Sequence, residues 1–257
     1  MDSVKLQKYF SDCGIMSRRA AEEIIQKGLV RVNGQIATLG DRILPGSDLV
    51  EYKGSPVVPT AEGKRYLLLY KPRGYVTTMS DEKGRPAAVS LLSSVRERVY
   101  PIGRLDMDSE GLLLFTNDGD LTYALTHPRH EIPKIYRVTV KGELSAQTLR
   151  ALSSSMVIDG YTILPVKTTL ISESSERGEA TLEMTLYEGR NRQIRKMCAA
   201  VGLSVRSLCR IAIGDLRIGR LRPGQWRDLS LKEIEALKKT SSAAESGQHE
   251  RKQSRPC

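Results

Sequence analysis

Hydrophobic and polar positions repeat with two different periods along the chain, and these periods predict its helices and strands. Near the start, Ser17 is a good helix N-cap, apolar residues follow it at helical spacing, and Gly28 ends the helix. Asn33 and Gly34 then predict a two-residue hairpin turn between short strands. We therefore expect residues 1–60 to form a small domain of their own.

Beyond a segment rich in Pro, Ser and Gly, which predicts a linker at residues 55–64, strand and helix patterns are intermixed. The strands predicted after this linker cover residues 66–70, 112–115, 135–140, 163–171 and 180–187. The helices predicted in the whole chain cover residues 4–10, 18–27, 120–126, 145–153, 191–201 and 231–239. Strands outnumber helices and do not alternate with them regularly, which favours an α+β fold over residues 61–240. The polar tail, residues 241–257, is expected to be disordered because it can bury little surface.

The charge of the chain points to an anionic partner. Its 257 residues carry a formal net charge of +10, and no amphipathic cationic helix or membrane-length apolar run accompanies that charge. Most of the excess lies between residues 186 and 227, where nine arginines and one lysine face only two acids. The planar guanidinium of arginine suits phosphate, so this distribution indicates nucleic acid rather than a membrane.

Cysteine usage and the first residues bear on the compartment. The four cysteines show no Cys-x-x-Cys pairing, and His127 and His130 have no cysteine nearby in the sequence, so a zinc site is not expected. The first ten residues lack the apolar core of a signal peptide. We therefore expect free thiols, a cytoplasmic location and a monomer.

Arg18 and Arg19 occupy the first turn of the helix that Ser17 caps. Cations at that end oppose the helix dipole, which costs a few tenths of a kcal/mol (roughly 0.3 each). A bound phosphate would remove the conflict, because helix N-termini attract anions. The pair is thus either a phosphate contact or an ordinary pair of exposed arginines.

Three acids follow Arg104 at every second position and precede the apolar run at residues 112–115. They are Asp106, Asp108 and Glu110. On a regular strand they would share one face and could hold Mg²⁺, as in a nuclease. Alternatively, one carboxylate acts covalently or as a base, or the segment is a solvated turn. The turn-forming residues Ser109 and Gly111 argue against a regular strand, so one working acid is favoured.

The sequence pattern alone does not decide the roles of two further residues. Tyr136 lies in an alternating strand pattern, where a tyrosine most often serves packing. Arg195 lies on the polar face of the helix predicted at residues 191–201, where it is either solvated or a phosphate contact.

Several motifs together resemble those of the ribosomal RNA pseudouridine synthases of the small-subunit and large-subunit uridine type. They lie at residues 70–75, 103–106, 111–119, 134–136, 188–197 and 224–229. The first 55 residues resemble an S4-like RNA-binding module. Lys5 replaces a more usual arginine, and Met107 also departs from the family pattern. The resemblance implies an S4-like domain followed by a pseudouridine synthase domain, with a mixed, mostly antiparallel sheet flanked by helices.

The resemblance also implies roles for the open residues. Asp106 would be the nucleophile, and Arg195 its ion-pair partner. Tyr136 would stack on the target base and help to remove a proton from its carbon 5. Asp108 and Glu110 would be supporting or solvated residues. No cofactor or metal is implied, because pseudouridine is an isomer of uridine.

A uridine within folded RNA must leave its stack before a carboxylate can reach it. The basic residues that would hold the RNA during this step are Arg104, Arg190 and Arg192, with Lys8, Arg18 and Arg19 of the first module as a second anchor. The expected partner is ribosomal RNA or a ribosome assembly intermediate, with large-subunit RNA favoured over small-subunit RNA.

Three other classes of protein are alternatives. A metal-dependent nuclease using the three acids would lose activity in EDTA, whereas a synthase would not. A non-enzymatic rRNA-binding assembly factor would have no need of Asp106, Tyr136 and Arg195 together. An RNA methyltransferase with the same module is disfavoured, because no glycine-rich nucleotide-binding loop follows a predicted strand.

Overall fold

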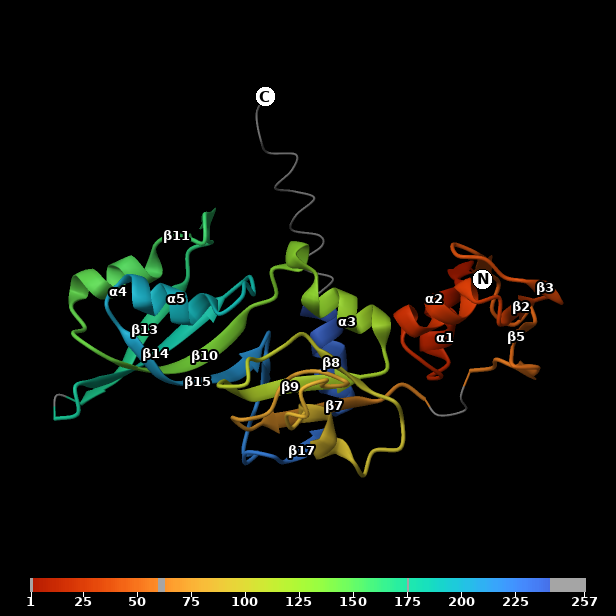
Figure 1. Cartoon of the computed structure of the whole chain (residues 1–257). Coiled ribbons are helices and arrows are strands. Elements are labelled where there is room, and N and C mark those ends of the chain that lie inside the picture. The colour runs from red at the N-terminus through yellow and green to blue at the C-terminus, as the bar shows by residue number, and fades with distance from the viewer. Residues whose placement is uncertain (1, 60–62, 175, 241–257) are drawn as a thin grey trace. The chain divides into compact units, whose positions relative to one another are not determined.

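The computed structural model describes residues 2–59, 63–174 and 176–240, which divide into two compact units (Figure 1). The first unit contains the described residues up to Arg65 together with Val95–Val99 and Asn117–Gly119. The second contains the remainder. The tail predicted to be disordered, residues 241–257, lies outside the described residues.

The first unit pairs two helices with short strands. Its elements are β1 (Val4–Lys5), α1 (Leu6–Asp12), α2 (Arg18–Gln26), β2 (Val30–Val32), β3 (Gln35–Ile36), β4 (Arg42–Ile43), β5 (Val50–Tyr52) and β6 (Ser55–Pro56). The Ser17 hydroxyl accepts a hydrogen bond from the Ala20 amide at 3.1 Å, which confirms the predicted N-cap. The helix α1 begins two residues later than predicted, because β1 pairs with β4 instead. Asn33 and Gly34 have positive φ values of 51° and 80°, as a two-residue hairpin turn between β2 and β3 requires.

A single strand path runs through the sheet of the second unit. Its strands are β7 (Tyr66–Lys71), β8 (Tyr100–Ile102), β9 (Glu110–Thr116), β10 (Lys134–Lys141), β13 (Lys167–Ser174), β14 (Glu179–Leu186), β15 (Ser204–Ile213), β16 (Leu216–Arg217) and β17 (Trp226–Asp228). The order is β13-β14-β10-β15-β9-β7-β17, with β16 beside β15 and β8 beside β9. Of the pairs in this sheet, β15 and β9 are parallel and the others are antiparallel. This sheet confirms the predicted α+β class.

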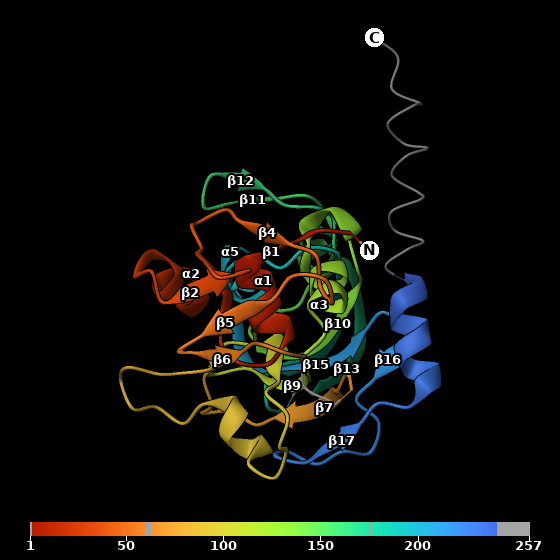
Figure 2. The same cartoon turned by 90° about the vertical axis from the view of Figure 1, so that its right-hand side faces the viewer.

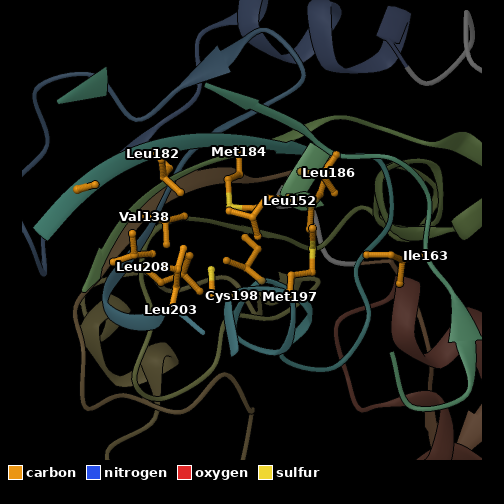
Figure 3. Packing of buried hydrophobic residues seen from close by; sticks show 14 residues of the cluster. Val138, Leu152, Ile163, Leu182, Met184, Leu186, Met197, Cys198, Leu203 and Leu208 are labelled. Carbon is orange, nitrogen blue, oxygen red and sulfur yellow. The ribbon is translucent and has the colours of Figure 1, made fainter. Parts of the chain in front are cut away.

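Helices cover the two halves of this sheet separately. They are α3 (Gly119–Thr126), α4 (Ala146–Ser153), α5 (Gln193–Ala200) and a last helix at residues 231–240, with short 3-10 turns at Ala88–Leu92 and Pro128–His130 and a small hairpin of β11 (Val157–Ile158) and β12 (Tyr161–Thr162). Residues of α4 and α5 pack with those of β10, β14 and β15 in one buried cluster. In Figure 3, Met184 and Leu186 of β14 face Met197 and Cys198 of α5. The last helix lies beside β16, and Leu237 shares a second cluster with Leu216 (Figure 2).

One predicted strand is displaced in the structure, and several of its strands were not predicted. The strand predicted at residues 163–171 lies four residues later, as β13, so Ile163 and Val166 are buried ahead of it. The longest strand, β15, was not predicted at all, because Arg210 occupies an inward position and breaks the apolar alternation. None of the helices within the described ranges is long and apolar enough to cross a membrane.

Candidate active site

A cavity of about 300 Å³ opens in the second unit, where the loop before β9, the start of β10, the loop before α5 and the middle of β15 come together. Residues from all four segments line it, including Arg104, Asp106, Lys134, Tyr136, Arg192 and Arg210. Arg190 lines it too, whereas Arg195 does not. The cavity thus gathers the predicted acid, the predicted tyrosine and several arginines.

Asp106 lies in a turn that enters β9, and neighbouring backbone groups hold this turn. The Ser109 amide donates to the Asp106 carbonyl at 3.1 Å. The ammonium of Lys71, which is fully buried, donates to the Ser109 carbonyl at 2.7 Å. Burial lowers the pKa of Lys71 to about 8, although the acids at 106, 108 and 110 favour its charged form. Hydrogen bonds from buried groups therefore fix the turn, while Asp106 itself is half-buried at the cavity.

Arg192 binds the acids of this turn. Its guanidinium forms a bidentate pair with the Asp108 carboxylate at 3.1 and 3.0 Å, and Nη1 lies 3.6 Å from Oδ2 of Asp106. Burial alone would raise the pKa of Asp108, but the hydrogen bond from Arg192 and the charge of Arg195 lower it overall. Arg192 has a φ of 52°, so it holds this position in a backbone conformation that non-glycine residues rarely adopt.

Arg195 does not form the direct ion pair with Asp106 that was predicted. Its Nη2 donates to the Asp108 carbonyl at 3.0 Å and lies 3.2 Å from Oδ2 of Asp108. That expectation was wrong because the arginine reaches the backbone of the turn rather than its first carboxylate. Arg195 therefore holds the turn through Asp108, and its charge acts on Asp106 only at longer range.

The three acids do not form a metal site. Asp106, Asp108 and Glu110 do not follow one another along a strand, because residues 107–108 form a turn and β9 begins at Glu110. No group of three or more potential metal ligands occurs among the described residues. Arginines rather than further acids surround Asp106 and Asp108, which disfavours the nuclease interpretation.

Tyr136 lies on β10 directly opposite Arg210 of β15, and Met184 of β14 lies on its other side. The tyrosine is half-buried and lines the cavity, so its position fits a stacking role as well as packing. Arg210 was not selected from the sequence. The signal that would have revealed it is the row Leu208, Arg210 and Ala212, which places a charge among inward-facing positions of one strand.

Gly111 brings β15 and the acid-bearing turn together. A Cβ at this position would lie 2.3 Å from the Arg210 carbonyl oxygen and 2.9 Å from the Cys209 sulfur, and its φ is +107°. Only glycine fits this conformation and this approach. The parallel pairing of Cys209 with Glu110 and of Arg210 with Gly111 follows from it.

The residues predicted to bind RNA fall in different surroundings. Arg104 is exposed at the cavity. Arg190 donates from Nε to Glu188 at 3.2 Å and lies over the ring of Tyr161, 4.7 Å from its centroid. It is therefore partly held by the protein itself.

In the first unit, Arg18 and Arg19 are exposed at the start of α2, and their side chains form no hydrogen bond or ion pair with any described residue. Lys8 is instead paired with Asp12 at 2.8 Å. The arginine pair is therefore freer to meet an anion than the lysine.

Comparisons with known proteins agree with this geometry. A family model described as RNA pseudouridylate synthase matches residues 65–200, and one described as S4 domain matches residues 4–49. The Bacillus subtilis (strain 168) protein named ribosomal large subunit pseudouridine synthase B is 40% identical over 235 residues, which cover 91% of this chain and 95% of the relative.

Another relative is the dual-specificity RNA pseudouridine synthase RluF of Escherichia coli (strain K12), which is 37% identical over 235 residues and aligns with 90% of this chain and 77% of its own. A crystal structure of a pseudouridylate synthase superposes with a TM-score of 0.63 at 28% identity, covering 91% of this chain and 100% of the other. This chain therefore belongs to the RNA pseudouridylate synthase family, whose members are isomerases, and it carries an S4 domain.

Proposed function

We propose that this protein isomerises one specific uridine of ribosomal RNA to pseudouridine, with large-subunit RNA favoured as the substrate. The observation that carries the proposal is the cavity in which an acid in a fixed turn, Asp106, meets Tyr136 and several arginines. The name of the Bacillus subtilis relative supports ribosomal RNA of the large subunit.

In this proposal Asp106 is the nucleophile, and its carboxylate must be ionised. Arg192, whose Nη1 lies 3.6 Å from Oδ2 of Asp106, forms the ion pair with this carboxylate. Arg195 keeps the turn in place through the carbonyl and carboxylate of Asp108. These two arginines share the role that the family resemblance implies for Arg195 alone.

Tyr136 stacks on the target base and assists in removing the proton from carbon 5. The base must first leave the RNA stack, at a cost of a few kcal/mol (about 2–4) that phosphate contacts offset. The exposed Arg104 is placed beside the cavity to occupy the vacated space or to hold a neighbouring phosphate.

The remaining basic residues anchor the RNA. Arg190 and Arg192 lie along its path at the cavity, and Arg18 and Arg19, with a smaller part for Lys8, form a second anchor. We take residues 1–60 and 61–240 as the two functional domains, acting as a monomer in the cytoplasm on ribosomal RNA or an assembly intermediate. Two linked anchors raise the local concentration of the substrate at the cavity.

The test is tritium release from uridine labelled at carbon 5, in separate small-subunit and large-subunit transcripts. The wild-type protein should release tritium from the large-subunit transcript. Asp106→Asn should abolish release while RNA binding is kept, because the amide has nearly the same shape as the carboxylate. Activity near the wild-type level in the purified variant would refute the nucleophile assignment, and release from only the small-subunit transcript would refute the subunit.

A further inference from the structure

Two cations in the buried part of the cavity have no role in the reaction described so far. Arg210 is only 3% exposed, and Lys134 is half-buried beside it on the neighbouring strand. Arg210 lies directly opposite Tyr136, and Lys134 lies two residues before Tyr136 on the same face of β10. All three side chains line the cavity together with Asp106.

Neither cation is neutralised by the protein. Arg210 donates from Nε to the Leu112 carbonyl at 2.8 Å and from Nη1 to the Arg104 carbonyl at 3.5 Å. Its Nη2 is buried and has no hydrogen-bond partner in the part of the chain that the structure describes. Lys134 donates to the carbonyl of Ile132 at 2.9 Å, and none of the described carboxylates forms an ion pair with either cation.

Lys71 shows what a structural cation looks like in the same region. It is fully buried and, like Arg210, donates to two backbone carbonyls, but three acids favour its charged form. Arg210 and Lys134 instead repel each other, and burial together with Arg210 lowers the pKa of Lys134 to about 8. A buried charge without a partner is unfavourable, and such an arrangement at a cavity is typical of a site that awaits an anion.

We propose that Arg210 and Lys134 form a cationic floor of the cavity, which binds a carbonyl oxygen of the target uracil and stabilises the negative charge that develops on this ring. The proposal rests on the proposed function and adds two catalytic residues to it. Backbone phosphates of the RNA are a poorer fit, because the exposed arginines at residues 104, 190 and 192 lie at the surface, whereas Arg210 is buried.

The reaction creates a charge at the place where the floor lies. When the bond between ribose carbon 1′ and uracil N1 breaks, its electron pair moves to N1 and spreads onto O2 and O4. In the version of the mechanism in which the Asp106 carboxylate adds to carbon 1′, carbon 5 of the turned base later displaces that carboxylate. Carbon 5 then loses its proton, and N1 takes up a proton. Atoms and electrons balance without a co-reactant. Fixed cations at the developing charge lower the barrier to the first step.

The first test does not depend on turnover. The probe is free 5-nitrouracil, whose ring is anionic near neutral pH, compared with neutral uracil by ligand-observed NMR. The wild-type protein should bind the anion about tenfold more tightly, a difference of about 1.4 kcal/mol. Arg210→Met should lose this preference, whereas Arg150→Met, which removes an exposed arginine from α4, should keep it. Equal binding of the two rings by the wild-type protein would overturn the proposal.

The second test is single-turnover tritium release. Arg210→Met should lower the rate by about 100-fold with RNA affinity unchanged, and Arg210→Lys should recover part of the rate. A rate within threefold of wild type overturns the proposal, as does a loss of RNA affinity with a flatter salt dependence, which marks a phosphate contact. Loss of rate in both variants together with a lower melting temperature also overturns it, because Arg210 then only holds the Leu112 and Arg104 carbonyls. Failure of the proposed function would give a different result. The wild-type protein would then release no tritium but would still prefer the 5-nitrouracil anion to uracil.

Discussion

Gly111 lies where β9 pairs with β15, and no side chain fits there, which leads to a testable prediction. In Gly111→Ala, the new Cβ would meet the Arg210 carbonyl oxygen at 2.3 Å in a backbone with φ +107°. We expect the free energy of unfolding to fall by about 3 kcal/mol or more, since strain and overpacking add. Urea unfolding followed by the fluorescence of Trp226, the single tryptophan, measures it.

A second glycine serves as a control that separates the cost of backbone strain from the cost of overpacking. Gly160 has a φ of +78° and nothing within 4 Å of the place that an added methyl group would take, so Gly160→Ala should lose only about 1 kcal/mol from strain. Equal losses in the two variants would mean that the close approach of β15 to Gly111 has no energetic consequence.

At the residue scale, the sequence singles out the acid segment that lies at the cavity, but it does not predict which arginine binds which acid. Spacing and turn-forming residues identify the segment around Asp106 and argue against a strand through all three acids, as the structure has it. Arg192 and its partner Asp108 are separated by 84 positions in the chain. Arg210 is held by the carbonyl of Leu112, which is 98 positions away. Local patterns carry no information on such contacts.

The element scale offers a test at the last helix, residues 231–240. The Ser230 amide donates to Glu233 at 2.9 Å, and Glu233 also pairs with Arg227 at 2.6 Å. The hydrogen bond from Arg227 lowers the pKa of Glu233 to about 2 from a usual 4.5. Its contribution is therefore complete above about pH 4.5 and is lost as the pH falls toward 2.

Glu233→Gln should accordingly lower the free energy of unfolding by about 1 kcal/mol at pH 7, a value limited by the partial exposure of the pair. The difference from wild type should shrink as the pH is lowered, again followed by Trp226 fluorescence. Glu235→Gln, at an exposed position on the same helix, should have almost no effect at any pH. A difference for Glu233→Gln that stays constant down to acid pH would contradict the role of its charge.

Elements with clear end signals or a clear apolar pattern were predicted well, including β7, β10 and β14, whereas β15 was not. Helix α2 begins after Ser17, which caps it as predicted, and α4 begins after Ser145, one residue from its predicted start. The strand β15 was missed because the buried Arg210 disguises its inward face. A buried charged residue thus interrupts the alternation of apolar and polar residues by which ordinary strands are predicted.

At the scale of the whole molecule, composition and pattern predict the α+β class but not the strand order. The parallel contact of β15 with β9 joins segments about 100 residues apart, and it brings Arg210 beside the acid-bearing turn. No local signal specifies that neighbour. The site is therefore assembled by topology, from residues that each have an ordinary explanation on their own element.

The charge of the first unit provides the prediction that concerns the full chain. Arg18 and Arg19 are exposed at a helix N-terminus that already attracts anions, so each should neutralise one phosphate of the RNA. Replacing both by alanine should weaken binding of ribosomal RNA and reduce the slope of log affinity against log salt by about 1.5. In the control variant, Arg150 and Lys167, two exposed cations of the second unit, are replaced by alanine in the same way. This variant should have an unchanged slope. Because the salt slope counts phosphates and is insensitive to a general loss of folded protein, an unchanged slope in the first variant would remove this unit from the RNA interface even if affinity fell.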